Sequence, residues 1–159
     1  MINKQFLIDT FQYQDGNLYW KKSKQGVAKD LKAGSMDSKG YIRVFLNNHP
    51  ILAHRIIFMM HYGYMPNVID HIDGNPANNK IENLREATKA QNNQNSKLRI
   101  TNTSGSKGVC WDAKVDKWKV RIGNNNKRIT VGYFEDLELA DLVAQEARDK
   151  YHGKFARYI

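Results

Sequence analysis

The sequence has little of what stabilises small secreted domains. It contains one cysteine, Cys110, so neither a disulfide framework within the chain nor a multi-cysteine zinc cluster can form. No apolar run is long enough to cross a bilayer, and the opening stretch MINKQFLIDTFQYQDG lacks the pattern of a signal peptide. We therefore expect an intracellular protein that has no membrane partner.

What the chain does have is enough apolar sequence to fold and an excess of positive charge. Hydrophobic residues make up 41% of its 159 residues, which suffices for one medium domain or two small ones. The formal net charge of +9 indicates a polyanionic partner, most simply nucleic acid. The charge is uneven: residues 97–131 hold nine Lys/Arg against two Asp/Glu, whereas residues 132–159 hold four against six. We expect one face aimed at phosphates and another facing solvent.

The first part of the chain has strand patterns and turn signals. Residues 15–20 and 40–46 are predicted strands, and residues 51–64 change from a strand into an apolar helix that ends at Gly63. Thr88 followed by Gln91 is a capping box, which predicts a short helix over residues 89–96.

The second part has a different pattern. Residues 97–105 are polar and rich in Ser, Thr, Asn and Gly, which is typical of a linker. Residues 108–123 and 127–134 alternate as strands around a hairpin tip at 124–126, and residues 136–153 have helical spacing with Gly153 as the expected C-cap. The expected domains are residues 1–96 and 106–159, joined by a linker over 97–105.

The stretch VIDHIDGNPANNKIENL, residues 68–84, contains the residue types that phosphodiester hydrolysis requires. Histidine can deprotonate water near neutral pH, and Asp and Asn oxygens are ligands for the hard divalent cation that neutralises the phosphate. Adjacent strand residues point to opposite faces, but a bent strand end can bring His71 and Asp70 to one site. A solvated loop has a similar composition, so the residue types alone leave both interpretations open.

The spacing of these residues resembles a known motif. Asp70 and His71, then Asn83 twelve residues after His71 and Asn92 nine residues later, resemble the HNH nuclease motif with its final histidine replaced by asparagine. The similarity covers residues 52–96, including the pair His54-Arg55, and is closest to phage-type endonucleases, among them homing endonucleases.

The resemblance implies a role for each position. His71 would be the general base, Asp70 and Asn92 would hold one divalent metal ion, Mg²⁺ or Mn²⁺, and Asn83 would fix the orientation of His71. The third-position asparagine favours an oxygen-ligated magnesium ion and disfavours zinc.

Other residues near the motif have competing interpretations. Asp73 is expected to be a turn residue, Asn78 and Asn79 to lie at the loop tip, and His54 to be structural. Three basic residues either contact phosphates or are plain surface charges: Arg55, Arg85 and Lys89.

The carboxy-terminal part, residues 106–158, resembles an AP2 DNA-binding domain. The residues that carry this similarity are Gly108, Val109, Trp111, Trp118, Arg121, Ile122, Val131, Gly132, Tyr133, Phe134, Ala140, Ala144, Ala147, Tyr151, Gly153 and Phe155. The family packs a three-stranded antiparallel sheet on one helix and lays the sheet in the DNA major groove. Its contact positions correspond here to Lys107, Lys117 and Arg128, and Lys119 and Arg121 are further candidates.

Two departures from the AP2 pattern affect the expected target. Cys110 stands where an arginine is usual, and Thr130 where a tryptophan is usual, so a plant-type target sequence is not expected.

These patterns together predict an α+β protein. A ββα-metal (His-Me finger) nuclease unit with a β-rich amino-terminal extension would be followed by an AP2-like sheet and helix. The implied function is metal-dependent hydrolysis of phosphodiester bonds in duplex DNA, as in a phage homing endonuclease, intron-encoded or free-standing, in the cytoplasm of an infected bacterium. A monomer would nick, and cutting both strands would need a homodimer or a second visit.

Two rival functions stay open at this point. One is a DNA-binding regulator whose nuclease site is inactive, and the other is an RNA-binding module, since basic and aromatic residues also suit RNA.

Overall fold

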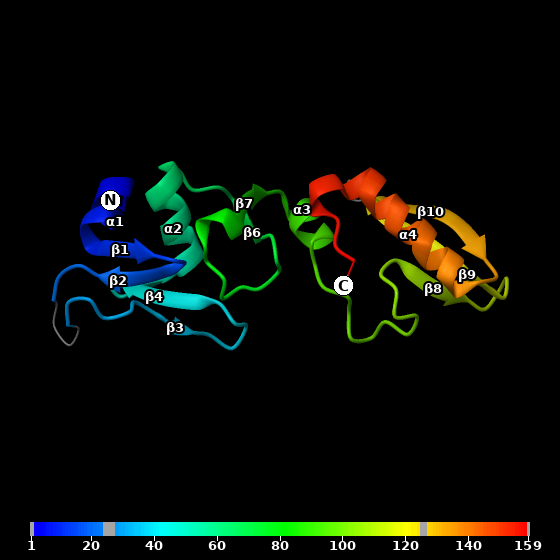
Figure 1. The fold of residues 1–159 in the computed structure, drawn as a ribbon, viewed down its shortest axis with the longest axis horizontal. Coiled ribbons are helices and arrows are strands. Elements are labelled where there is room, and N and C mark those ends of the chain that lie inside the picture. Colours follow the sequence, from blue (N-terminus) through cyan, green and yellow to red (C-terminus); the bar gives the residue numbers. More distant parts are fainter. Residues whose placement is uncertain (1, 24–27, 125–126, 159) are drawn as a thin grey trace. The chain divides into compact units, whose positions relative to one another are not determined.

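Four small antiparallel sheets and four α-helices alternate along the part of the chain that the structure describes (Figure 1). This computed structural model describes residues 2–23, 28–124 and 127–158. The chain divides into two compact units, Met1–Ala87 and Thr88–Ile159. The predicted α+β class is confirmed. No helix in the described ranges combines the length and the apolarity that a bilayer crossing needs.

The first unit contains two helices and seven strands among its described residues. In chain order its elements are α1 (Lys4–Thr10), β1 (Phe11–Gln14), β2 (Asn17–Trp20), β3 (Ser35–Met36), β4 (Ile42–Leu46), β5 (His49–Leu52), α2 (Ala53–Tyr62), β6 (Val68–His71), the 3-10 turn η1 (Ile81–Asn83) and β7 (Leu84–Ala87). β1 pairs with β2, β4 lies between β3 and β5, and β6 pairs with β7, all antiparallel.

Helix α2 sits at the centre of this unit. It follows β5 without a loop and ends at Gly63, whose φ of 81° gives the left-handed cap that terminates many helices. The predicted change from strand to helix is therefore confirmed. Its apolar face, with Ile56, Ile57 and Phe58 almost fully buried, packs into one core with residues from α1 and the strands.

Helix α1 was not expected, because the opening residues were assigned to a β-rich extension. Asn3 caps the helix by accepting a hydrogen bond from the backbone N–H of Phe6 at 2.9 Å, and Leu7 is its buried anchor. The helix has seven residues, about two turns, which is too short for a helical period to stand out in the sequence. The amino-terminal extension is thus mixed, with α1 and α2 beside its strands.

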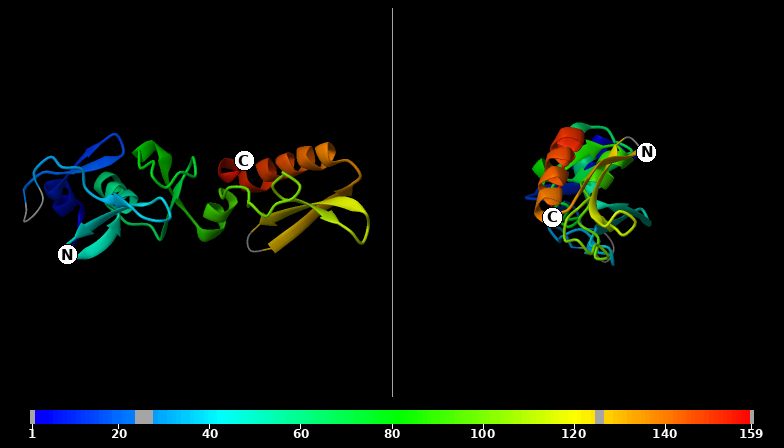
Figure 2. Two further views of the ribbon diagram at one scale, coloured as in Figure 1. Left: turned by 90° about the horizontal axis from the view of Figure 1, so that it is seen from below. Right: turned by 90° about the vertical axis from the view of Figure 1, so that its right-hand side faces the viewer.

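The second unit is a three-stranded sheet packed on one long helix. Its elements are α3 (Lys89–Gln94), β8 (Val109–Asp112), β9 (Lys117–Asn124), β10 (Lys127–Phe134), α4 (Leu137–His152) and the 3-10 turn η2 (Gly153–Phe155). The strand order is β10-β9-β8, and α4 lies along one face of this sheet (Figures 1 and 2). The predicted sheet and helix are confirmed, whereas the hairpin tip predicted at 124–126 lies partly outside the described residues.

The core of this unit forms between α4 and the sheet. Val109 and Val120 pair across β8 and β9 and meet Ala140 and Ala144 of α4, and all four are buried. Small alanines allow the helix to approach the sheet closely, which agrees with the pattern expected for residues 136–153.

The two compact units meet between β7 and α3, ahead of the predicted linker over residues 97–105. Within the second unit, the end of α3 is tied to the segment before β8. Nζ of Lys107 donates to the backbone oxygens of Gln94 at 2.7 Å and Ser96 at 2.5 Å.

The turn between β1 and β2 supports another part of the first unit. Gly16 has a φ of 81°, and a Cβ atom on it would lie 2.8 Å from the backbone nitrogen of Lys80 and 3.1 Å from the carbonyl carbon of Asn79. The hydroxyl of Tyr13 accepts a hydrogen bond from the backbone N–H of Ile81 at 3.1 Å. The β1–β2 hairpin is therefore in close contact with residues 79–81.

This contact leads to a prediction for two glycines with the same φ of 81°. Gly63→Ala should cost about 1 kcal/mol of unfolding free energy from left-handed strain, because the nearest atom, Cδ of Lys4, would be 3.6 Å away. Gly16→Ala should cost about 1–3 kcal/mol more, because backbone blocks the new methyl group. Urea unfolding of the full chain measures both, and equal losses would contradict the proposed contact.

Candidate functional site

The hairpin of β6 and β7 brings together two of the predicted site residues. Asp70 and His71 end β6, where they pair with Arg85 and Leu84 of β7. Both side chains are buried, with 3% and 5% exposed, although they are neighbours on one strand. The loop over residues 72–83 closes the hairpin, so these two polar side chains are held inside the fold and not in a solvated loop.

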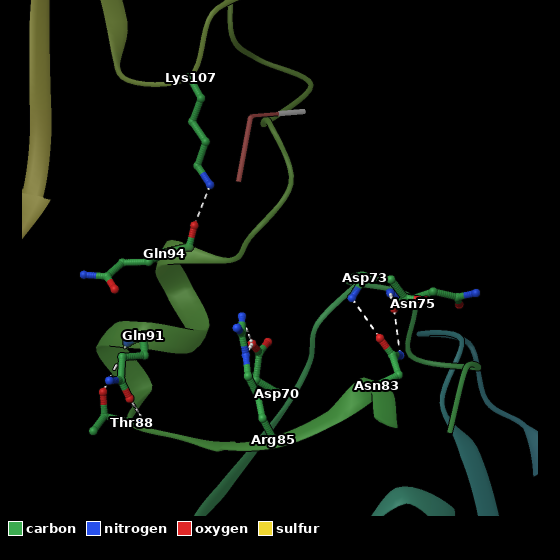
Figure 3. A network of polar contacts seen from close by, with 9 residues as sticks. All are labelled: Asp70, Asp73, Asn75, Asn83, Arg85, Thr88, Gln91, Gln94 and Lys107. Atoms are coloured by element: carbon green, nitrogen blue, oxygen red, sulfur yellow. Dashed lines mark hydrogen bonds and ion pairs between the residues drawn. The ribbon is translucent and has the colours of Figure 1, made fainter. Parts of the chain in front are cut away.

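Asp70 is held by an ion pair across the hairpin. Its Oδ2 accepts hydrogen bonds from Nε of Arg85 at 2.8 Å and from Nη2 at 2.7 Å (Figure 3). Both side chains are largely buried, so the guanidinium compensates a carboxylate that would be costly to bury alone. Arg85, predicted as a phosphate contact, is thus a partner of the predicted metal ligand.

His71 is fixed by an asparagine that the motif analysis assigned to the loop tip. Its Nε2 lies 3.0 Å from Oδ1 of Asn79, and Asn79 is 2% exposed. With the amide oxygen of Asn79 facing the ring, this contact favours the tautomer in which Nε2 donates and Nδ1 is the basic nitrogen. Sequence reasoning missed Asn79 because nothing in the composition distinguishes it from Asn78 beside it.

Asn83 closes the loop instead of contacting His71 directly. Its Oδ1 accepts from the backbone N–H of Asp73 at 3.0 Å, and its Nδ2 donates to Oδ1 of Asp73 at 2.9 Å and to the backbone oxygen of Asn78 at 2.8 Å (Figure 3). The amide therefore joins both sides of the loop next to Asn79. Its predicted effect on His71 would act through the loop.

Asp73 is a turn residue, as expected. Its carboxylate accepts from the backbone N–H of Asn75 at 2.8 Å and from Nδ2 of Asn78 at 2.6 Å. Burial acts to raise the pKa of Asp73, but the hydrogen bonds from Asn75, Asn78 and Asn83 outweigh it and hold that pKa below its usual value. The carboxylate stays charged and organises the loop.

Two further aromatic groups surround His71. The ring of His54 lies 5.0 Å from that of His71, nearly perpendicular to it, and the ring of Tyr41 lies 5.6 Å from His54 and 6.0 Å from His71. Burial lowers the pKa of His54 to about 3, and the charges of His71 and Arg55 act in the same direction. His54 is therefore a neutral, structural wall of the site, as expected from the sequence.

The remaining predicted residues near the motif lie on helices. Arg55, on α2, donates to the backbone oxygen of Pro66 at 3.3 Å, and Lys89 is exposed on α3. Asn92 is also exposed on α3, which begins with the predicted capping box of Thr88 and Gln91 (Figure 3).

The predicted metal ligands have the donor chemistry of a hard cation. Asp70 offers carboxylate oxygen and Asn92 amide oxygen, and magnesium is commonly held by one or two such protein ligands together with water and substrate phosphate. No group of three His, Cys, Asp or Glu side chains that could hold a metal occurs among the described residues. A ligand pair of one acid and one amide is a different kind of site, and its chemistry fits magnesium or manganese.

The sheet of the second unit has a cationic outer face. Strand register puts Lys117, Lys119 and Arg121 of β9 opposite to the buried Val120, and Arg128 of β10 pairs beside them with Gly123. Four of the predicted DNA contacts therefore share the face that α4 leaves uncovered.

Several of these cations already have partners. Nζ of Lys119 contacts Asp112 at 3.2 Å, and Nζ of Lys117 contacts Glu135 at 3.2 Å. Arg121 lies near the sulfur of Cys110, with Nη2 and Sγ 3.3 Å apart.

The fifth predicted contact, Lys107, is partly buried and makes the two carbonyl contacts that attach α3, one of which is drawn in Figure 3. Its pKa is lowered to about 8, first by burial and also by the charges of Arg148 and Arg157.

Comparison with known proteins agrees with the geometry of the hairpin. The family model for the HNH endonuclease matches residues 52–94, which include α2, β6, β7 and α3. Protein 3.8 of Escherichia phage T7 is 38% identical over 92 residues, which are 57% of this chain and 74% of that protein. No solved structure matches the chain. These similarities show that the chain carries an HNH endonuclease family domain over residues 52–94 and belongs to the same family as protein 3.8 of phage T7.

Proposed function

We propose that this protein is a metal-dependent endonuclease that hydrolyses phosphodiester bonds in duplex DNA. The observation that carries the proposal is the buried pair of His71 and Asn79, in which Nε2 of the imidazole lies 3.0 Å from Oδ1 of Asn79 and the ring is held in one orientation. A histidine that is oriented in this way, beside a carboxylate at the end of a strand, is what a general base for water requires.

In the proposed reaction His71 takes a proton from the attacking water at Nδ1. Asn79 keeps the ring in the required tautomer, and Asn83 maintains the loop that carries Asn79. The rings of His54 and Tyr41 pack against His71 and limit the positions that its imidazole can occupy.

Asp70 and Asn92 are the proposed ligands of one divalent ion, Mg²⁺ or Mn²⁺. When bound, such an ion neutralises the scissile phosphate and the leaving oxygen. Arg85 compensates the charge of Asp70, so binding of the metal ion would change the electrostatic environment of both side chains. Members of the HNH family typically use a divalent metal, which agrees with this assignment.

The second unit is the proposed DNA clamp, an AP2-like domain whose sheet enters the major groove. Its uncovered face carries Lys117, Lys119, Arg121 and Arg128, which suit phosphates and guanine edges. Four further basic residues are proposed phosphate contacts: Arg55, Arg85, Lys89 and Lys107. Three of them, Arg55, Arg85 and Lys107, also make contacts within the protein.

We assign the biological role from the resemblance to phage-type enzymes and from the phage relative. The proposal is a phage homing endonuclease, intron-encoded or free-standing, in the cytoplasm of an infected bacterium. The functional domains remain those of the motifs, residues 1–96 and 106–159 with a connection at 97–105. One active site cuts one strand, so a monomer nicks, and cutting both strands needs a homodimer or a second visit.

One observation favours a second candidate function, a DNA-binding regulator with an inactive nuclease site. Arg85 neutralises the carboxylate that should bind metal, which is what a site without a metal would also need. Cleavage measurements separate the two candidates.

The first test is cleavage of supercoiled plasmid that carries phage genomic DNA, with magnesium, with manganese and with EDTA. The wild-type protein should convert the plasmid to nicked or linear form only when a metal is present. His71→Ala should lower the cleavage rate by about 10²–10⁴-fold, because general-base catalysis contributes this much.

The matched control for this test is His49→Ala, which removes an exposed histidine of β5. It should cleave like the wild-type protein. Tight binding to duplex DNA without cleavage under any metal would contradict the nuclease and favour the regulator.

A second prediction concerns Asn79. Asn79→Ala should lower kcat by about 10- to 100-fold with little change in KM, because the base is misoriented while DNA binding is untouched. Asn79→Asp keeps an acceptor oxygen in place and should restore part of the rate.

Imidazole nitrogen chemical shifts distinguish orientation from a general loss of structure. They should report the Nε2–H tautomer of His71 in the wild-type and Asn79→Asp proteins, and a mixture of tautomers in Asn79→Ala. An unchanged tautomer with an unchanged kcat would show that Asn79 does not position His71.

A further inference from the structure

A pocket of about 390 Å³ in the second unit is bordered by basic side chains from several segments. It lies among α3, β9, β10 and the end of α4. None of the described residues that line it is an aspartate or glutamate. The basic residues are Lys107, Arg121, Lys127, Arg128, Arg148 and His152.

The most buried of these is Arg148, with 2% of its surface exposed. Its Nη1 donates to the backbone oxygen of Lys107, and its guanidinium lies 5.5 Å from the centre of the Tyr158 ring. Its Nε is buried and has no hydrogen-bond partner among the described residues. A buried cation with an unsatisfied N–H is costly, so its retention calls for a reason.

The neighbouring groups show the effect of like charges in a confined space. Burial lowers the pKa of Lys107 to about 8, with Arg148 and Arg157 adding to the effect. Burial also lowers the pKa of His152, whose Nε2 lies 2.7 Å from the backbone oxygen of Gly123, and Lys107 and Arg148 contribute in the same direction. The pocket therefore keeps cations at a cost that a bound anion would offset.

We propose that this pocket binds a single phosphate group. Lys127 is exposed and can meet the ligand from solvent, while Arg148 and Lys107 provide positive charge from within. Phosphate oxygens are acceptors that suit guanidinium and ammonium donors. The group comes either from the DNA backbone or from a free phosphate compound, and both share this chemistry.

The binding of phosphate does not depend on nuclease activity. The inference that the phosphate group belongs to the DNA backbone rests on the proposed function. A backbone phosphate held here would fix the register of the outer sheet face on the duplex without reading sequence. This is separate from contacts of the sheet with base edges.

The experiment uses the full chain with inorganic phosphate as the probe and chloride at equal ionic strength as the reference. Phosphate should raise Tm and shift the His152 resonances of the wild-type protein. Lys127→Glu should weaken phosphate binding by at least about tenfold through repulsion at the exposed side of the pocket. Lys150→Glu, an equal charge change at an exposed position of α4 outside the lining, should bind phosphate as the wild-type protein does.

Duplex binding distinguishes the two sources. If DNA supplies the group, about one fewer counterion is released when Lys127→Glu binds duplex DNA, as measured by the slope of log affinity against log salt. Lys150→Glu keeps the wild-type slope, and phosphate competes with the duplex. If a free compound supplies it, Lys127→Glu loses phosphate binding and keeps duplex binding.

Equal Tm gains in chloride and phosphate, or equal losses in the two variants, would overturn the site. None of these readouts requires cleavage. A negative phosphate result would therefore not contradict the nuclease proposal, and the phosphate measurements can be made even if the protein does not cleave DNA.

Discussion

The hairpin of β6 and β7 is closed by the side-chain amide of Asn83. Its three hydrogen bonds join the two sides of the loop over residues 72–83. In the same loop Asn79 is buried, and its Oδ1 lies 3.0 Å from Nε2 of His71. A short polar loop of this kind has few apolar contacts of its own, so satisfied amides provide its order.

Both units bury charge, and each does so differently. In the first unit Asp70 and Arg85 compensate each other across two strands, which makes the carboxylate tolerable at 3% exposure. In the second unit Lys107 and Arg148 donate to backbone carbonyl oxygens, and the charges of Asp141 and Asp149 act on Arg148 without an ion pair to it among the described residues. The first arrangement is balanced within the protein, whereas the second leaves an excess of positive charge around a cavity.

The sequence predicted what is set by spacing and local pattern. The Asp70–His71 hairpin, the capping box at Thr88 and the sheet and helix of the second unit all follow from residues close together in the chain. Asn79, the pairing of Asp70 with Arg85 and the attachment of α3 through Lys107 were not predictable. They depend on which polar groups become buried, and burial is decided by packing between distant segments that no local pattern records.

The contact of the β1–β2 hairpin with the backbone of residues 79–81 affects which segments must stay together when the domain is transferred to another protein. The region that the HNH family model matches, residues 52–94, does not contain the β1–β2 hairpin that contacts the loop over residues 72–83. The recognisable motif is thus smaller than the piece that can be moved between proteins. A chimera that transplants the motif must carry the β1–β2 hairpin with it, and recombination that separates the two would leave the histidine without its support.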